Sequence, residues 1–193
     1  MIDREVFTMR LMIASDIHGS SYYLKKLLEQ YKNEQPDKLL LLGDLLYHGP
    51  RNDLPKGYDP QEIIGLLNNM KEEILCVRGN CDTEVDQMVL EFPILADYCI
   101  LYEQGRMIFA THGHHHNTST PPMLKSGDIL LHGHTHVPVK EKFGGRYYLN
   151  PGSVAIPKEN SAHSYMMLED GLFTWKDLDG DAYMNFQMDH HTR

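Results

Sequence analysis

The chain has 193 residues, of which 41% are hydrophobic and 23% are charged, and this composition is typical of a globular protein rather than a disordered or fibrous one. Its formal net charge of −9 disfavours a broad nucleic-acid-binding surface, because an acidic surface repels polyanions. No stretch approaches the roughly 18 apolar residues that a membrane helix needs, and the start, MIDREVFTMRLMIAS, lacks a secretory pattern. We therefore expect one cytoplasmic domain over residues 1–193, with no membrane partner.

The first half of the sequence alternates short apolar runs with helical patterns. Strands are predicted at 10–15, 38–42 and 73–77, and helices at 20–34 and 60–70, each with apolar residues on one face. A long loop rich in Gly, Pro, Asn and Asp follows the second strand. This strand–helix alternation predicts a parallel sheet with crossover helices.

The second half changes to short strands joined by tight turns. Gln104-Gly105 and Asp170-Gly171 each separate two apolar runs, which is a hairpin signal. Strands are predicted at 98–102, 107–111, 129–131, 137–142, 146–149, 164–169, 172–176 and 182–188. They predict a second sheet packed on the first. The three cysteines are too few and too irregular for a disulfide framework.

Each polar motif of interest begins where a predicted strand ends. The motifs are DIHG at 16–19, GD at 43–44, GNCD at 79–82, THGH at 111–114 and HGHTH at 132–136. Because ligands of α/β sheets bind outside the carboxyl ends of the strands, we expect these loops to converge on one edge.

The residue types in these motifs point to divalent metal ions. Imidazole, carboxylate and amide oxygen without thiolate suit Mn²⁺, Fe²⁺, Zn²⁺, Co²⁺ or Ni²⁺. The candidate ligands are too many for one ion, but they fit two ions that share a carboxylate, hold a water and clamp phosphoryl oxygens. They are Asp16, His18, Asp44, Asn80, His112, His134 and His136.

The order of these motifs resembles that of the calcineurin-like metallophosphoesterase superfamily. The motifs are D-x-H, G-D, G-N, H-G-H and G-H-T-H. The segments VRGNCDTEVDQM, HGHTHVP and NPGSVAIPK are similar to its YfcE-type bacterial phosphodiesterases. The resemblance implies a four-layer αββα sandwich with two mixed β-sheets, and a homo-dimer or homo-tetramer. It also implies one ion held by Asp16, His18 and His136, a second held by Asn80, His112 and His134, and Asp44 as the bridge.

Several further residues carry weaker expectations. Cys81 stands where phosphomonoesterases of the superfamily usually have an acid–base His, which puts monoester cleavage in doubt. Arg51 could donate hydrogen bonds to two phosphoryl oxygens, or it could instead stabilise its own loop. His114 could contact substrate near the second ion. Asp82 is expected to cap the following helix. His115 and His116 are expected to be exposed loop residues.

The sequence therefore predicts a metal-dependent phosphodiesterase that hydrolyses a small phosphodiester with a hydroxide bridging two divalent ions, Mn²⁺ being the first choice. Two alternatives stay open. The same ions could serve a phosphomonoesterase or a nucleotide pyrophosphatase, and the fold could instead be a non-catalytic, retromer-like binding scaffold. Retention of every candidate ligand favours catalysis.

Overall fold

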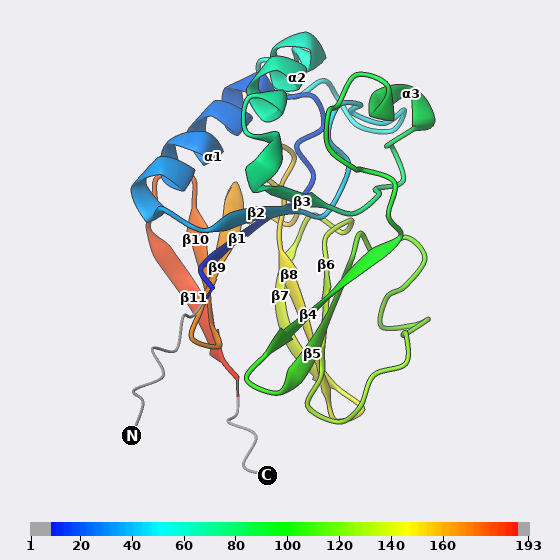
Figure 1. The fold of residues 1–193 in the computed structure, drawn as a ribbon, viewed down its shortest axis with the longest axis vertical. Helices are drawn as coiled ribbons and strands as arrows, with labels where there is room; N and C mark the ends of the chain where they lie inside the picture. Colours follow the sequence, from blue (N-terminus) through cyan, green and yellow to red (C-terminus); the bar gives the residue numbers. More distant parts are fainter. Residues whose placement is uncertain (1–8, 189–193) are drawn as a thin grey trace.

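The computed structural model describes residues 9–188 (Figure 1). The domain predicted over 1–193 and the expectation about its N-terminal segment therefore extend into residues 1–8 and 189–193, which lie outside the described part.

Six strands form the first sheet in the order β11-β10-β9-β1-β2-β3. The three N-terminal strands are parallel, β9 is antiparallel to β1, and β10 and β11 each pair antiparallel with the preceding strand. In chain order the members are β1 (Leu11–Ala14), β2 (Lys38–Leu41), β3 (Ile74–Cys76), β9 (Ser164–Glu169), β10 (Leu172–Asp177) and β11 (Ala182–Gln187). This confirms the crossover sheet that the first half of the sequence predicts.

Two helices make the crossovers, α1 (Ser21–Glu34) after β1 and α2 (Pro60–Asn68) after β2. Each begins at a residue whose side chain accepts a backbone N–H of the first turn, Ser20 for α1 and Asp59 for α2. A 3₁₀ turn, η1 (Lys71–Glu73), precedes β3, and a single turn, α3 (Glu84–Gln87), follows it.

Five strands form the second sheet in the order β4-β5-β6-β8-β7. The central strands β5, β6 and β8 are parallel, and each edge strand is antiparallel to its neighbour. In chain order the members are β4 (Tyr98–Glu103), β5 (Arg106–Thr111), β6 (Ile129–His132), β7 (Pro138–Phe143) and β8 (Arg146–Pro151).

The two sheets pack face to face around a common core (Figure 1). Leu11 and Leu40 of the first sheet meet Ile129 and Leu149 of the second, all fully buried. The other face of the first sheet is covered by α1 and α2 through a second apolar cluster. Two mixed sheets in a layered α/β sandwich are therefore confirmed.

The fourth layer is not helical within residues 9–188. The outer face of the second sheet packs Phe109 and Leu130 against Leu124, which comes from the irregular segment between β5 and β6. In the same described range, no helix has both the length and the apolarity needed to cross a bilayer.

Candidate metal centre

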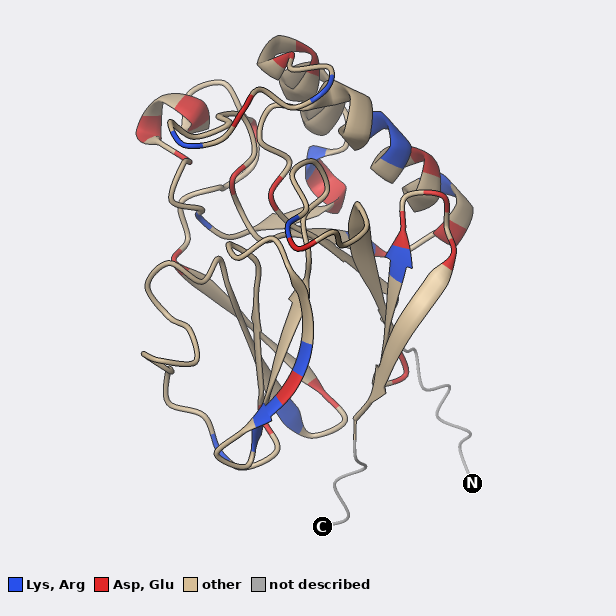
Figure 2. Ribbon diagram, turned by 180° about the vertical axis from the view of Figure 1, so that it is seen from behind, with Lys and Arg blue, Asp and Glu red and all other residues tan. Residues whose placement is uncertain are grey.

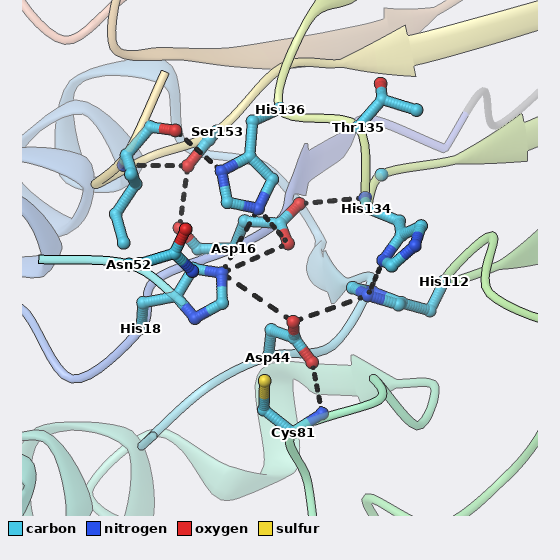
Figure 3. Close-up of polar contacts among 12 residues, drawn as sticks. Asp16, His18, Asp44, Asn52, Cys81, His112, His134, Thr135, His136 and Ser153 are labelled. Carbon is cyan, nitrogen blue, oxygen red and sulfur yellow. Dashed lines mark hydrogen bonds and ion pairs between the residues drawn. The ribbon is translucent and has the colours of Figure 1, made fainter. Parts of the chain in front are cut away.

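The carboxyl ends of five strands meet at one edge of the sandwich, and every predicted ligand follows one of them. Asp16 and His18 follow β1, Asp44 follows β2 and Asn80 comes after β3. His112 follows β5, and His134 and His136 follow β6. Figure 3 shows the carboxylates and imidazoles of these loops pointing toward one another. The convergence expected from the motif positions is confirmed.

The backbone at this edge is strained in a way that brings side chains inward. Asp16, His18, Asp44, His134 and His136 all have positive φ, between 48° and 66°, in the left-handed region that residues with a Cβ rarely adopt. Such conformations cluster at functional sites, where the surrounding structure holds them.

Two glycines allow the loops to approach closely. A Cβ on Gly79 would lie 2.1 Å from Oδ1 of Asp44. A Cβ on Gly133 would lie 1.9 Å from Oγ of Ser15 and 2.7 Å from Oδ2 of Asp16. Any side chain at either position would displace a carboxylate of the cluster.

The first group of ligand atoms consists of Asp16, His18 and His136. Nδ1 of His18 donates to the carbonyl of Tyr47 (2.9 Å), and Nδ1 of His136 donates to that of Ile156 (2.6 Å). Each neutral ring therefore presents a lone pair at Nε2, yet the two Nε2 atoms are only 3.2 Å apart. Two acceptors at that distance require a positive charge between them.

The carboxylate of Asp16 completes this group. Its Oδ1 lies 3.2 Å from Nε2 of His136 and 3.5 Å from Nε2 of His18. Among the described residues this buried oxygen has no hydrogen-bond donor. Its other oxygen, Oδ2, accepts the backbone N–H of His134 at 3.1 Å. A buried, undonated carboxylate oxygen beside two imidazole lone pairs has the donor set and the geometry to hold a divalent cation.

The second group consists of Asn80, His112 and His134. Nδ1 of His112 donates to the carbonyl of Leu42 (2.7 Å), so its Nε2 faces inward. That nitrogen is 3.1 Å from Oδ1 of Asn80 and 3.1 Å from Nδ1 of His134. Nε2 of His112 thus lies close to two further atoms that could act as ligands.

Asp44 lies between the two groups. Its Oδ2 is 3.6 Å from Nε2 of His18 and 3.4 Å from Nε2 of His112, while its Oδ1 accepts the backbone N–H of Cys81 at 2.8 Å. One carboxylate oxygen of Asp44 thus faces both groups of candidate ligand atoms.

The pKa directions fit a cluster that requires positive charge. Burial opposes ionisation of Asp16, but the neighbouring His136 and His18 outweigh it and hold the pKa of that carboxyl well below its usual range. Burial also opposes protonation of His112, yet Asp44 and Asp16 raise the pKa of its imidazole to about 9. In the metal-free protein a proton can therefore occupy the space that a cation would fill.

Asp82 does not cap the helix, so that prediction was wrong. Thr83 caps α3 instead, in a reciprocal capping box with Asp86. Asp82 is buried, and its carboxylate accepts three backbone N–H groups, those of Asp44 (2.8 Å), Leu45 (2.9 Å) and Gly79 (2.7 Å). It ties the loop after β2, which carries Asp44, to the loop after β3.

An open cavity of about 400 Å³ leads to the ligand groups. Its rim includes Arg51, as the sequence suggested, and also Asn52 and Lys158, which the sequence analysis did not single out. Nδ2 of Asn52 donates to the carbonyl of His48 (2.8 Å), and the backbone N–H of Lys158 donates to that of His136 (3.1 Å). Arg51 and Lys158 are exposed and give a strongly acidic protein two cations at this cavity.

The remaining predicted residues lie close by with different surroundings. Cys81 is half-buried at the cavity, where burial and the nearby Asp44 raise the pKa of its thiol. His114 lies beside His112, with ring centroids 5.4 Å apart, and burial lowers its pKa to about 4. His115 is exposed as expected, but His116 is half-buried against Phe109.

This fold and this set of side chains define a metallophosphoesterase. Residues 9–170 match the calcineurin-like phosphoesterase superfamily domain, and the chain belongs to that superfamily.

Among curated proteins, the chain is 45% identical to phosphodiesterase YfcE of Escherichia coli strain K12, over 86% of this chain and 90% of that protein. The solved structure of YfcE, a phosphoesterase from E. coli, superposes with a TM-score of 0.90 at 42% identity, covering 94% of this chain and 100% of that chain. Vps29 of Entamoeba histolytica in complex with Zn²⁺ has a TM-score of 0.61 at 21% identity, covering 94% and 100%, and shares the fold alone.

Proposed function

We propose that this protein is a phosphodiesterase that holds two divalent metal ions and hydrolyses a small phosphodiester. The ligands in this proposal are Asp16, His18, Asp44, Asn80, His112, His134 and His136. The observation that carries it is the 3.2 Å approach of the Nε2 lone pairs of His18 and His136 beside the undonated Oδ1 of Asp16. Ions bound there would supply a water of lowered pKa for in-line attack and stabilise the charge that develops on the phosphoryl oxygens.

The side chains of the chain have separate tasks in this scheme. Main-chain carbonyls fix the tautomers of three imidazoles, which orients each ring before a ligand arrives. Arg51 and Lys158 attract the anionic substrate and hold its phosphoryl oxygens at the cavity. Elsewhere in the view of Figure 2, Lys and Arg lie among Asp and Glu; on β7, for example, Lys140 and Lys142 flank Glu141.

Preference for a diester is supported by Cys81 and by the relationship to phosphodiesterase YfcE. Phosphomonoesterases of the superfamily usually have at this position a His that helps to protonate the leaving group. A thiol whose pKa is raised remains neutral and is a weak hydrogen-bond donor. The scaffold alternative is disfavoured because five of the seven candidate ligands line an open cavity. They are His18, Asp44, Asn80, His134 and His136. Mn²⁺, the cytoplasmic location and a dimeric or tetrameric state are proposed from the sequence alone.

The test is metal-reconstituted turnover. We expect a chelator to abolish hydrolysis of bis(p-nitrophenyl) phosphate and Mn²⁺ to restore it. Ca²⁺ should restore little, because it prefers oxygen-rich sites and this one has four imidazoles. A panel of monoesters, diesters and dinucleotides then separates the alternatives, since faster cleavage of matched monoesters would favour a phosphomonoesterase. Full activity in the metal-free protein would contradict the two-ion proposal.

A further inference from the structure

A second hollow adjoins the cavity of the candidate metal centre. It also has a volume of about 400 Å³, and Cys81 lines both spaces. Its walls come from the loop after β2, from α2 and from the segment around α3, which lie at the same end of the molecule (Figure 1). Because the backbone of Cys81 contacts Oδ1 of Asp44 at 2.8 Å, the shared wall stands directly beside the proposed bridging ligand.

The chemistry of this hollow differs from that of the metal-site cavity. Its surface is formed largely by aliphatic and aromatic side chains, including Tyr47, Ile64, Val85 and Val89. Among the described residues that line it, Asp86 has the only formal charge. That carboxylate already accepts the backbone N–H and the hydroxyl of Thr83, at 2.8 and 2.9 Å. The hollow therefore offers apolar contact and no cation, whereas Arg51 and Lys158 lie at the neighbouring cavity.

The apolar walls are open to solvent in the free protein. Val85 is 69% exposed, Val89 43% and Tyr47 42%. Covering such surface is favourable, so a ligand with an apolar group at this position gains affinity. The metal-site cavity and the hollow share Cys81 as a lining residue, so a phosphoryl group in the cavity would lie close to these walls.

We propose that the hollow binds one uncharged aromatic or aliphatic ester group of the substrate while its phosphoryl group occupies the adjoining cavity. This inference rests on the proposed function and narrows its substrate class. The substrate is then a diester with an apolar arm. A nucleoside polyphosphate fits less well, because its further phosphates would face a hollow that contains a carboxylate and no cation.

Calorimetric binding to the Mn²⁺-loaded protein tests the inference without relying on turnover. Methylphosphonate and phenylphosphonate present the same anionic head with a small or an aromatic arm. We expect phenylphosphonate to bind at least about tenfold more tightly, a difference of about 1.4 kcal/mol. The double variant Val85→Asn, Val89→Asn should lose this preference and keep the affinity for methylphosphonate. Both positions are exposed, so the fold should tolerate the change.

Met88→Asn is the matched control, because Met88 lies in the same segment, is 84% exposed and does not line the hollow. It should retain the wild-type preference. Equal affinity of the wild-type protein for the two phosphonates would overturn the inference, as would an equal loss of preference in the control. If the double variant instead changes the oligomeric mass and neither protein prefers the aromatic arm, a second copy covers the hollow and the inference is wrong.

A separate measurement distinguishes failure of the proposed function from failure of the inference about the hollow. Metal-dependent hydrolysis of bis(p-nitrophenyl) phosphate, measured on the same preparations, reports on the proposed function alone. Turnover without an aromatic preference overturns only the inference about the hollow. Absence of metal-dependent turnover on any diester overturns both.

Discussion

Replacing Asp82 should weaken the fold at the candidate metal centre, although its carboxylate accepts backbone N–H groups there rather than contacting a side-chain ligand atom. Asp82→Ala would leave the backbone N–H groups of Asp44, Leu45 and Gly79 buried without an acceptor. With about 1–3 kcal/mol for each of the three unsatisfied groups, we expect a loss on the order of 3–9 kcal/mol in the free energy of unfolding. Asp82→Asn should cost about 1–3 kcal/mol, because its amide keeps one oxygen acceptor.

Urea denaturation of the chelated protein measures this loss, and calorimetric titration with Mn²⁺ measures the accompanying loss of metal affinity. The denaturation midpoint should fall with an unchanged m-value, since the same surface is exposed on unfolding. Asp179→Ala is the control, because the side chain of Asp179 is 75% exposed and, within residues 9–188, forms an ion pair with the exposed Lys26, so its loss should change little. An Asp82→Ala midpoint equal to that of the wild type, or an equal loss in the control, would refute the reasoning.

Three further outcomes are expected. Asp44→Asn should retain the fold but lose most turnover and at least one ion; metal analysis of the purified variant decides this, and two full-occupancy ions with a normal rate would remove Asp44 from the centre. Cys81→Ala should keep at least about a tenth of the rate on an activated aryl diester, a change of about 1.4 kcal/mol in the barrier, and Cys81→His should raise monoester relative to diester cleavage, since a well-placed acid contributes typically about 10²–10⁴-fold. A Cys81→Ala protein that binds two ions but does not cleave the activated diester would make the thiol catalytic. Light scattering should give a dimer or tetramer, and a mass near 22.3 kDa would contradict that expectation.

Much of the fold could be predicted because most strands appear in the sequence as short apolar runs, which are followed within a few residues by glycine or a charged residue. Parallel pairing of β1, β2 and β3 follows from the helices between them, and this pairing places Asp16, Asp44 and Asn80 at one edge. The positions of the motifs along the sequence therefore predict that the candidate ligand side chains converge, although they do not predict the distances between them.

Other features depend on tertiary contacts that no local pattern encodes. Asp82 precedes a helix, as a cap would, but Thr83 takes that role and leaves the carboxylate to accept amides from a loop distant in sequence. Lys158 reaches the cavity because a turn after β8 packs against His136. The outer face of the second sheet is covered by an irregular segment, and the resemblance alone had suggested a helix there.

The left-handed backbone at Asp16, His18, Asp44, His134 and His136 sets stability against function at this edge of the protein. Each such residue costs on the order of 1 kcal/mol compared with a glycine, which adopts the same conformation without a Cβ clash. Selection for folding alone would therefore favour glycine at all five positions. If these five residues hold metal ions as proposed, a descendant that abandoned the reaction could gain stability by replacing them with glycine.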